Sequence, residues 1–180
     1  MTAPIREPGK EEQAAPDAPE QRAMRRSAAR LAAVQALYQI EITNGVTAAV
    51  VDEFRAHRQG GVLEDALAKA DFKKFEAIVT GVDAHRQELD ALIAASLAKD
   101  WSLERLGSVL RAILRSAAFE LLAGKDVPAK VVINEYVDLT HAFFEGNEPG
   151  FVNGMLDRLA HQLRESEMQK ANREQPASPE

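Results

Sequence analysis

Four arginines near the amino terminus are the residues of this sequence best suited to binding a charged ligand. They lie within residues 21–30, a segment without any acidic residue: Arg22, Arg25, Arg26 and Arg30. In a helix, a spacing of four residues places side chains on one face. Guanidinium groups on such a face can bind phosphates through paired hydrogen bonds and stack on unpaired bases. The spacing alone fits two interpretations equally well: an RNA-binding face, or a solvated basic face that balances an acidic chain.

No other residues have the spacing of a catalytic or metal-binding motif. The histidines never stand three or four residues apart, as two metal ligands on one helix face would: His57, His85, His141 and His161. Gly60-Gly61 lacks the Lys and the Ser or Thr of a phosphate-binding loop, no serine has a nucleophile-elbow motif, and the sequence contains no cysteine. We therefore expect no enzyme activity, no metal and no cofactor.

The composition is that of one acidic globular domain. The chain has 180 residues and a formal net charge of −6, which argues against indiscriminate binding to nucleic acid. No apolar run approaches the roughly 20 residues of a membrane span, so no membrane partner is expected. Residues 1–20 lack the apolar segment of a secretory signal, which predicts a cytoplasmic location.

The spacing of apolar residues predicts an all-α fold of about seven helices in a compact bundle. The predicted helices cover residues 22–43, 47–59, 71–96, 108–124, 127–146 and 149–163, with a short helical turn over 102–107. Asp71 and Ser108 are predicted helix caps, and Gly81 is a predicted weak point. Residues 62–70 are either a loop or a helical turn.

Both ends of the chain are polar and contain several prolines. Residues 1–20 hold four prolines and a net charge of −3, which predicts a disordered acidic arm before a helical domain over 21–165. A disordered tail is predicted over 166–180. The acidic arm either competes with RNA for the neighbouring arginines or is an inert tail.

Three stretches together point to a known family. They are RRSAARLAAVQALY over residues 25–38, then RAILRSAAFELL with VPAKVVINE between 111 and 135, and FVNGMLD over residues 151–157. In this order and spacing they resemble the NusB family of transcription antitermination factors, and the likeness spans residues 22–163. The resemblance implies two packed helical subdomains and a non-enzymatic adaptor. The implied partners are the NusE ribosomal protein, the boxA element of nascent single-stranded RNA and the elongating RNA polymerase.

The resemblance also suggests where ligands bind. It places an RNA-contacting aromatic at Phe151, for which a core anchor in the first helical turn is the alternative. The ring of Tyr38 either stacks on a base or lies at the boundary of the core, because it falls on the apolar stripe of its helix.

Part of the NusE interface is placed on residues 104–115. The candidate contacts there are Glu104, Leu110, Arg111 and Arg115. Leu110 stands where the family usually has an acidic residue, so partner recognition at this position must differ.

Two other classes of protein stay open from the sequence. One is a helical protein-interaction module without an RNA role, from which salt-dependent binding would distinguish an RNA-binding protein. The other is a stand-alone relative of the amino-terminal RNA-binding domain of ribosomal RNA cytosine methyltransferases. The sequence does not distinguish a monomer from a homodimer.

Overall fold

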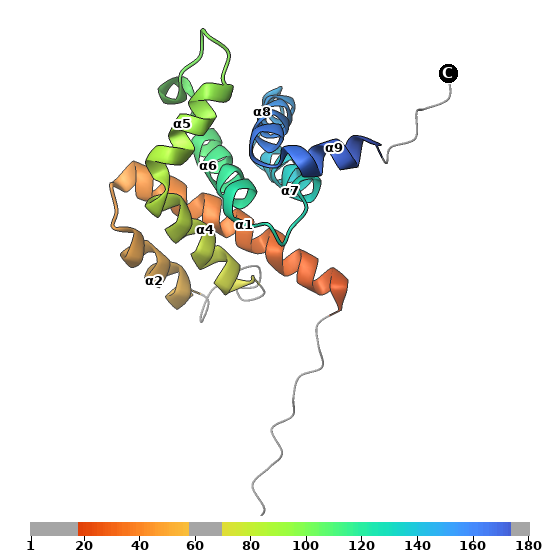
Figure 1. Ribbon diagram of the computed structural model, residues 1–180. Coiled ribbons are helices and arrows are strands. Elements are labelled where there is room, and N and C mark those ends of the chain that lie inside the picture. The colour runs from red at the N-terminus through yellow and green to blue at the C-terminus, as the bar shows by residue number, and fades with distance from the viewer. Residues whose placement is uncertain (1–17, 58–69, 174–180) are drawn as a thin grey trace, which may run out of the picture.

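The structure is a computed structural model that describes residues 18–57 and 70–173 (Figure 1). These residues form eight α-helices, one 3-10 helix and no strand. The α-helices are α1 (Pro19–Thr43), α2 (Thr47–His57), α4 (Phe72–Ala84), α5 (Arg86–Ser96), α6 (Ser108–Ala123), α7 (Ala129–His141), α8 (Glu148–Leu163) and α9 (Glu165–Arg173), and the 3-10 helix is η1 (Leu103–Arg105). The predicted all-α class is confirmed. Six α-helices and one short turn were predicted, whereas the described residues form eight α-helices and η1, because the helix predicted over 71–96 is divided and α9 was not predicted.

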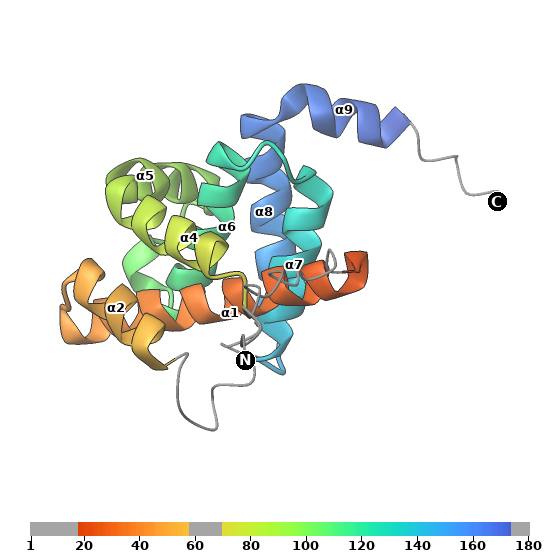
Figure 2. The same ribbon diagram turned by 90° about the horizontal axis from the view of Figure 1, so that it is seen from below.

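Helix α6 lies at the centre of the bundle, where it packs against α1, α4, α5, α7 and α8. On one side of it α1, α2 and α4 pack together, and on the other α7 packs against α8 (Figures 1 and 2). One continuous apolar cluster joins both sides. This arrangement confirms two packed helical subdomains.

The buried face of α1 consists largely of alanines. Ala29, Ala32, Ala33 and Ala36 are at most 2% exposed. Small side chains let neighbouring helices approach closely, and α1 packs against both α4 and α6 along this face. The predicted apolar stripe therefore lies partly at the edge of the core, and Tyr38 on it is 41% exposed.

The single helix predicted over 71–96 is wrong, because the chain breaks at His85 into α4 and α5. His85 has φ −107° and ψ 15°, outside the helical range. Both helices pack against α6, but their other partners differ: α4 packs against α1 and α2, and α5 packs against α8. Gly81 is a point of close approach, because a Cβ atom there would lie 2.0 Å from the ring of Phe119. The predicted cap is confirmed, since the Asp71 carboxylate accepts a hydrogen bond from the Lys74 backbone N–H at 3.0 Å.

Several predicted helix ends are corrected. Helix α1 begins at Pro19, so the last residues of the predicted arm are helical. Gly107 takes the cap position predicted for Ser108, and α7 ends at His141 instead of near residue 146.

The tail predicted to be disordered from 166 is wrong as far as 173. Helix α9 covers these residues, and its Met168 is 2% exposed. The predictions for residues 1–17, the helix stop at Gly60-Gly61, the ambiguous loop and the end of the tail lie outside the described residues.

Candidate nucleic-acid and partner interface

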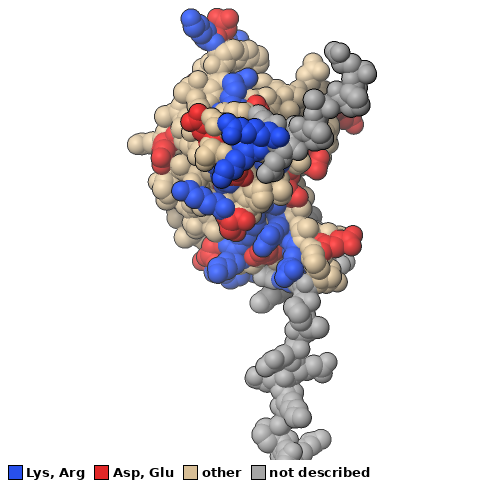
Figure 3. Space-filling model, turned by 45° about the vertical axis from the view of Figure 1, so that its right-hand side comes forward, with Lys and Arg blue, Asp and Glu red and all other residues tan. Residues whose placement is uncertain are grey.

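The first turns of α1 expose arginine side chains. Arg22 and Arg26 are exposed, whereas Arg25 is half-buried. The backbone carbonyl of Arg25 accepts a hydrogen bond from the backbone N–H of Asp71 at 2.9 Å, which fixes this part of α1 to the start of α4. Lysine and arginine side chains gather where the chain enters α1 (Figure 3). The start of α1 therefore presents cationic groups to solvent.

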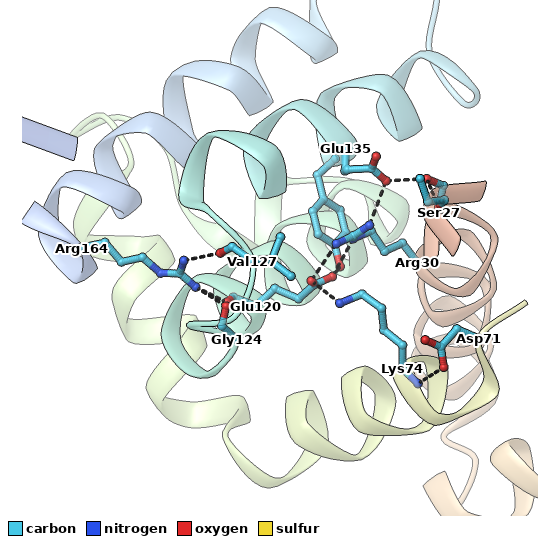
Figure 4. Close-up of polar contacts among 11 residues, drawn as sticks. Ser27, Arg30, Asp71, Lys74, Glu120, Gly124, Val127, Glu135 and Arg164 are labelled. Atoms are coloured by element: carbon cyan, nitrogen blue, oxygen red, sulfur yellow. Dashed lines mark hydrogen bonds and ion pairs between the residues drawn. The ribbon is translucent and has the colours of Figure 1, made fainter. Parts of the chain in front are cut away.

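The structure corrects the expectation that Arg30 faces a ligand. Arg30 is 2% exposed, and its Nε and Nη2 donate to the two carboxylate oxygens of Glu120 at 2.8 and 3.0 Å. Its Nη1 donates to Glu135 at 2.9 Å (Figure 4). All three donor nitrogens are thus occupied within the protein. The reason is its helical position, since it lies beside the alanines that face α6.

Glu120 is the centre of this buried cluster. Besides Arg30 it accepts hydrogen bonds from Lys74 Nζ at 2.7 Å and from the Tyr136 hydroxyl at 2.9 Å (Figure 4). Burial alone would raise the pKa of Glu120, but the hydrogen bonds and charges of Arg30 and Lys74 together outweigh it and lower the pKa below its ordinary value. Burial, together with the charge of Glu120, raises the pKa of Tyr136. The cluster ties α1, α4, α6 and α7 together.

Tyr38 lies on a different side of α1 from the exposed arginines. At about 100° per residue, Tyr38 is roughly a third of a turn away from Arg26 but within about 20° of Ser27 and Leu31. The ring of Tyr38 is 41% exposed. The candidate base-stacking ring and the exposed guanidinium groups therefore do not share one face.

Phe151 is half-buried in the first turn of α8 and packs against the core. Its ring centroid lies 6.2 Å from that of Trp101, which is 52% exposed. The guanidinium of Arg105 lies over the Trp101 ring, 5.7 Å from its centroid. Phe151 thus anchors the first turn of α8 to the core, while part of its ring stays exposed to solvent. Sequence reasoning missed its aromatic neighbour.

The predicted partner segment contains a second ion-paired cluster. Arg115 is 8% exposed and donates to Asp90 at 2.7 and 3.1 Å and to Glu41 at 2.8 Å. Arg111 also pairs with Glu41 and donates to the carbonyl of Leu106. Burial alone would raise the pKa of Glu41. Hydrogen bonds from Arg111 and neighbouring groups outweigh this effect, so the pKa of Glu41 lies below its ordinary value. These two arginines hold α6 to α1 and α5.

The other two residues proposed for the partner differ in exposure. Glu104 in η1 is exposed. Leu110 is half-buried and packs against the core, so the position is apolar and structural here. Of the four candidates, Glu104 presents its charge to solvent most openly.

The residues that sequence reasoning missed are the partners of the buried arginines. Glu120 and Glu135 stand inside the signature stretches and Glu41 follows the first of them, but spacing along the chain gave no sign that they meet α1 or α6 arginines. Within the described ranges no group of three or more His, Asp or Glu residues is placed to hold a metal ion. None of the described helices is long and apolar enough to cross a membrane.

The fold and the site define a class: a small all-α bundle with an arginine-rich helix start and internally paired polar clusters. The model of the NusB family matches residues 27–161, and the chain belongs to this family.

Relatives and solved structures agree with this membership. Transcription antitermination protein NusB of Sinorhizobium fredii is 51% identical over 149 residues, which is 82% of this chain and 93% of that protein. The protein of the same name from Sphingopyxis alaskensis is 51% identical over 144 residues, 79% of this chain and 97% of its own.

The structure of NusB from T. maritima superposes with a TM-score of 0.59 at 30% identity, covering 83% of this chain and 96% of that one. A structure of antitermination factors NusB and NusE in complex with dsRNA shares the fold, with a TM-score of 0.65 at 24% identity over 81% of this chain and 99% of that one.

Proposed function

We propose that this chain is a transcription antitermination adaptor that binds boxA-type RNA together with the ribosomal protein NusE and docks on elongating RNA polymerase. Membership of the NusB family and the relatives at 51% identity support this role. Such an adaptor acts in the cytoplasm through binding alone, without breaking a bond and without a cofactor.

The observation that carries the proposal is the exposure of Arg22 and Arg26 at the start of α1. Neither side chain has an ion pair with any other described residue, in contrast to Arg30 and Arg115. Unpaired guanidinium groups on a projecting helix end can neutralise phosphates without first breaking internal salt bridges. Arg22 and Arg26 are therefore the proposed phosphate contacts. Arg25, half-buried on the same turns of α1, is a further proposed contact because of its position beside them, and Tyr38 and Phe151 are the proposed contacts to bases.

We propose that NusE contacts the exposed part of residues 104–115 and not the ion-paired arginines of α6. Arg111 and Arg115 already have carboxylate partners, so Glu104 and the surface of η1 are better placed to meet a basic ribosomal protein. Leu110 contributes to the shape of this surface and carries no charge for a salt bridge.

The test is binding of a fluorescent boxA-type RNA to the protein, with and without NusE, at two salt concentrations. A variant with Arg22→Ala and Arg26→Ala is compared with one carrying Lys125→Ala and Lys170→Ala, which removes two exposed charges elsewhere. We expect the arginine variant to bind more weakly, with a salt dependence reduced by about 0.7 per lost phosphate contact, and the lysine variant to bind as the wild type does.

Equal RNA affinity of the arginine variant and the lysine variant would contradict the assignment of Arg22 and Arg26 as phosphate contacts. Absence of RNA binding in every combination, with NusE binding retained, would instead support a helical interaction module without an RNA role.

A further inference from the structure

A groove lies between α1 and α7 on the surface of the bundle. Its volume is about 310 Å³. Its apolar lining comes from Ala28 and Leu31 on α1 and from Leu139 and Ala142 at the end of α7. Two of these four side chains are alanines, which leave room between the helices. The groove is therefore an open slot with apolar walls on the surface of the bundle.

Two carboxylates of α7, those of Glu135 and Asp138, also line the groove. Glu135 Oε2 accepts hydrogen bonds from the Ser27 hydroxyl at 2.6 Å and from Arg30 Nη1 at 2.9 Å, so its charge is compensated inside the protein (Figure 4). Asp138 is exposed, and its carboxylate bonds to no other described residue. The groove thus offers one acceptor group that the protein itself does not use.

The groove continues a stripe of α1 that already contains an exposed aromatic ring. Leu31 and Tyr38 are seven residues apart and therefore lie within about 20° of each other around the helix. A strand of RNA that stacks a base on Tyr38 can place another base over Leu31, while its phosphates stay toward solvent. The carboxylates disfavour phosphates in the slot and favour the hydrogen-bond donors of a base edge.

We propose that this groove holds one unpaired RNA base that carries an exocyclic amino group, with Asp138 as the acceptor of that group. The apolar side chains of Ala28, Leu31, Leu139 and Ala142 contact the faces of the base. A carboxylate accepts from the exocyclic amino group of cytosine, adenine or guanine, whereas uracil has a carbonyl oxygen at the position of the cytosine amino group. The groove therefore contributes sequence preference, whereas the arginines contribute affinity. This inference rests on the proposed RNA-binding function.

The experiment uses the full chain with NusE and a boxA-type RNA in which each amino-bearing base is replaced singly by its counterpart without the amino group. These replacements are cytidine to uridine, adenosine to purine riboside and guanosine to inosine. We expect one position at which the replacement weakens binding by about fivefold or more. Asp138→Asn, which keeps one acceptor oxygen but loses the charge, should reduce the preference at that position, and Asp138→Ala, which has no acceptor, should remove it.

Two further variants separate this effect from general electrostatics and from misfolding. Ala142→Leu fills the slot at an exposed position and should weaken binding of the unmodified RNA, whereas Ala123→Leu at the exposed end of α6 should not. Asp126→Asn removes an exposed charge outside the groove, so it reports how much RNA affinity rises from a change of net charge alone.

The inference is overturned if Asp138→Asn and Ala142→Leu behave like these controls while the wild type binds RNA, a result that leaves the proposed function intact. It is also overturned if both variants weaken NusE binding in the absence of RNA, because the groove would then hold a partner side chain. If the wild type binds no RNA, the proposed function fails and this inference fails with it.

Discussion

The Nε atom of Arg30 lies 2.8 Å from Oε1 of Glu120, and both side chains are almost completely buried. The two residues are 90 positions apart in the chain. A buried charge is tolerated only when it is paired and hydrogen-bonded, and this pair meets both conditions. The arginine that looked most like a continuation of the cationic face is in fact part of the core.

Removing the carboxylate of Glu120 should destabilise the fold strongly. Glu120→Gln leaves the charge of Arg30 buried with only Glu135 beside it, and we expect a loss of about 3–5 kcal/mol in the free energy of unfolding. Urea unfolding measures this. Glu76→Gln is the control, because its ion pair with Arg55 is exposed and should contribute under about 1 kcal/mol. Similar losses in both variants would contradict the importance of burial.

Stability should fall in acid because of Glu120 and Glu41. The pKa of each is lower in the folded protein than its ordinary value of 4.5, so the unfolded chain binds more protons in this range. Their contribution is complete above pH 4.5 and is lost as the pH falls through the lowered pKa values. Denaturant midpoints measured from pH 6 to pH 3 should decline less steeply in a Glu41→Gln variant. An unchanged slope would show that Glu41 is not responsible.

Gly81→Ala should destabilise the protein although alanine is the better helix former. The added Cβ would lie 2.0 Å from the ring of Phe119, which must then move. We expect a loss of about 1 kcal/mol, measured by thermal unfolding. In a Phe119→Ala background the same substitution should instead stabilise by up to about 1 kcal/mol, because only helix propensity is left. The same sign in both backgrounds would refute the close-approach explanation.

Arg164 should be essential for the docking of α9. It is 7% exposed and donates to the carbonyls of Glu120, Leu121, Gly124 and Val127 at 2.7–2.8 Å. Arg164→Lys cannot supply all of these hydrogen bonds, and we expect a loss of about 2–4 kcal/mol together with faster amide exchange in α9. Arg173→Lys, at an exposed position, should change stability by less than about 0.5 kcal/mol. Unchanged exchange in α9 would rule out the proposed anchoring.

The sequence alone determined the helical class, most helix positions and the family. These features follow from local signals, which depend on neighbours within a few positions of the chain. Such signals are the helical spacing of apolar residues, the cap at Asp71 and the helix end at Gly124. The break at His85 and the helix after Leu163 could not be predicted locally. Beyond the shared contact with α6, α4 packs against α1 and α2 whereas α5 packs against α8, and α9 is held by the burial of Met168.

The candidate site, too, could be predicted only in part from the sequence. Residue type identified a cationic helix start, but only the tertiary structure separated exposed Arg22 and Arg26 from buried Arg30. That separation depends on Glu120 and Glu135, which come from α6 and α7 and approach α1 only in the folded bundle. A spacing of four residues fixes which side chains share a face of a helix. Whether that face meets solvent or a buried carboxylate is decided by the helices that pack against it.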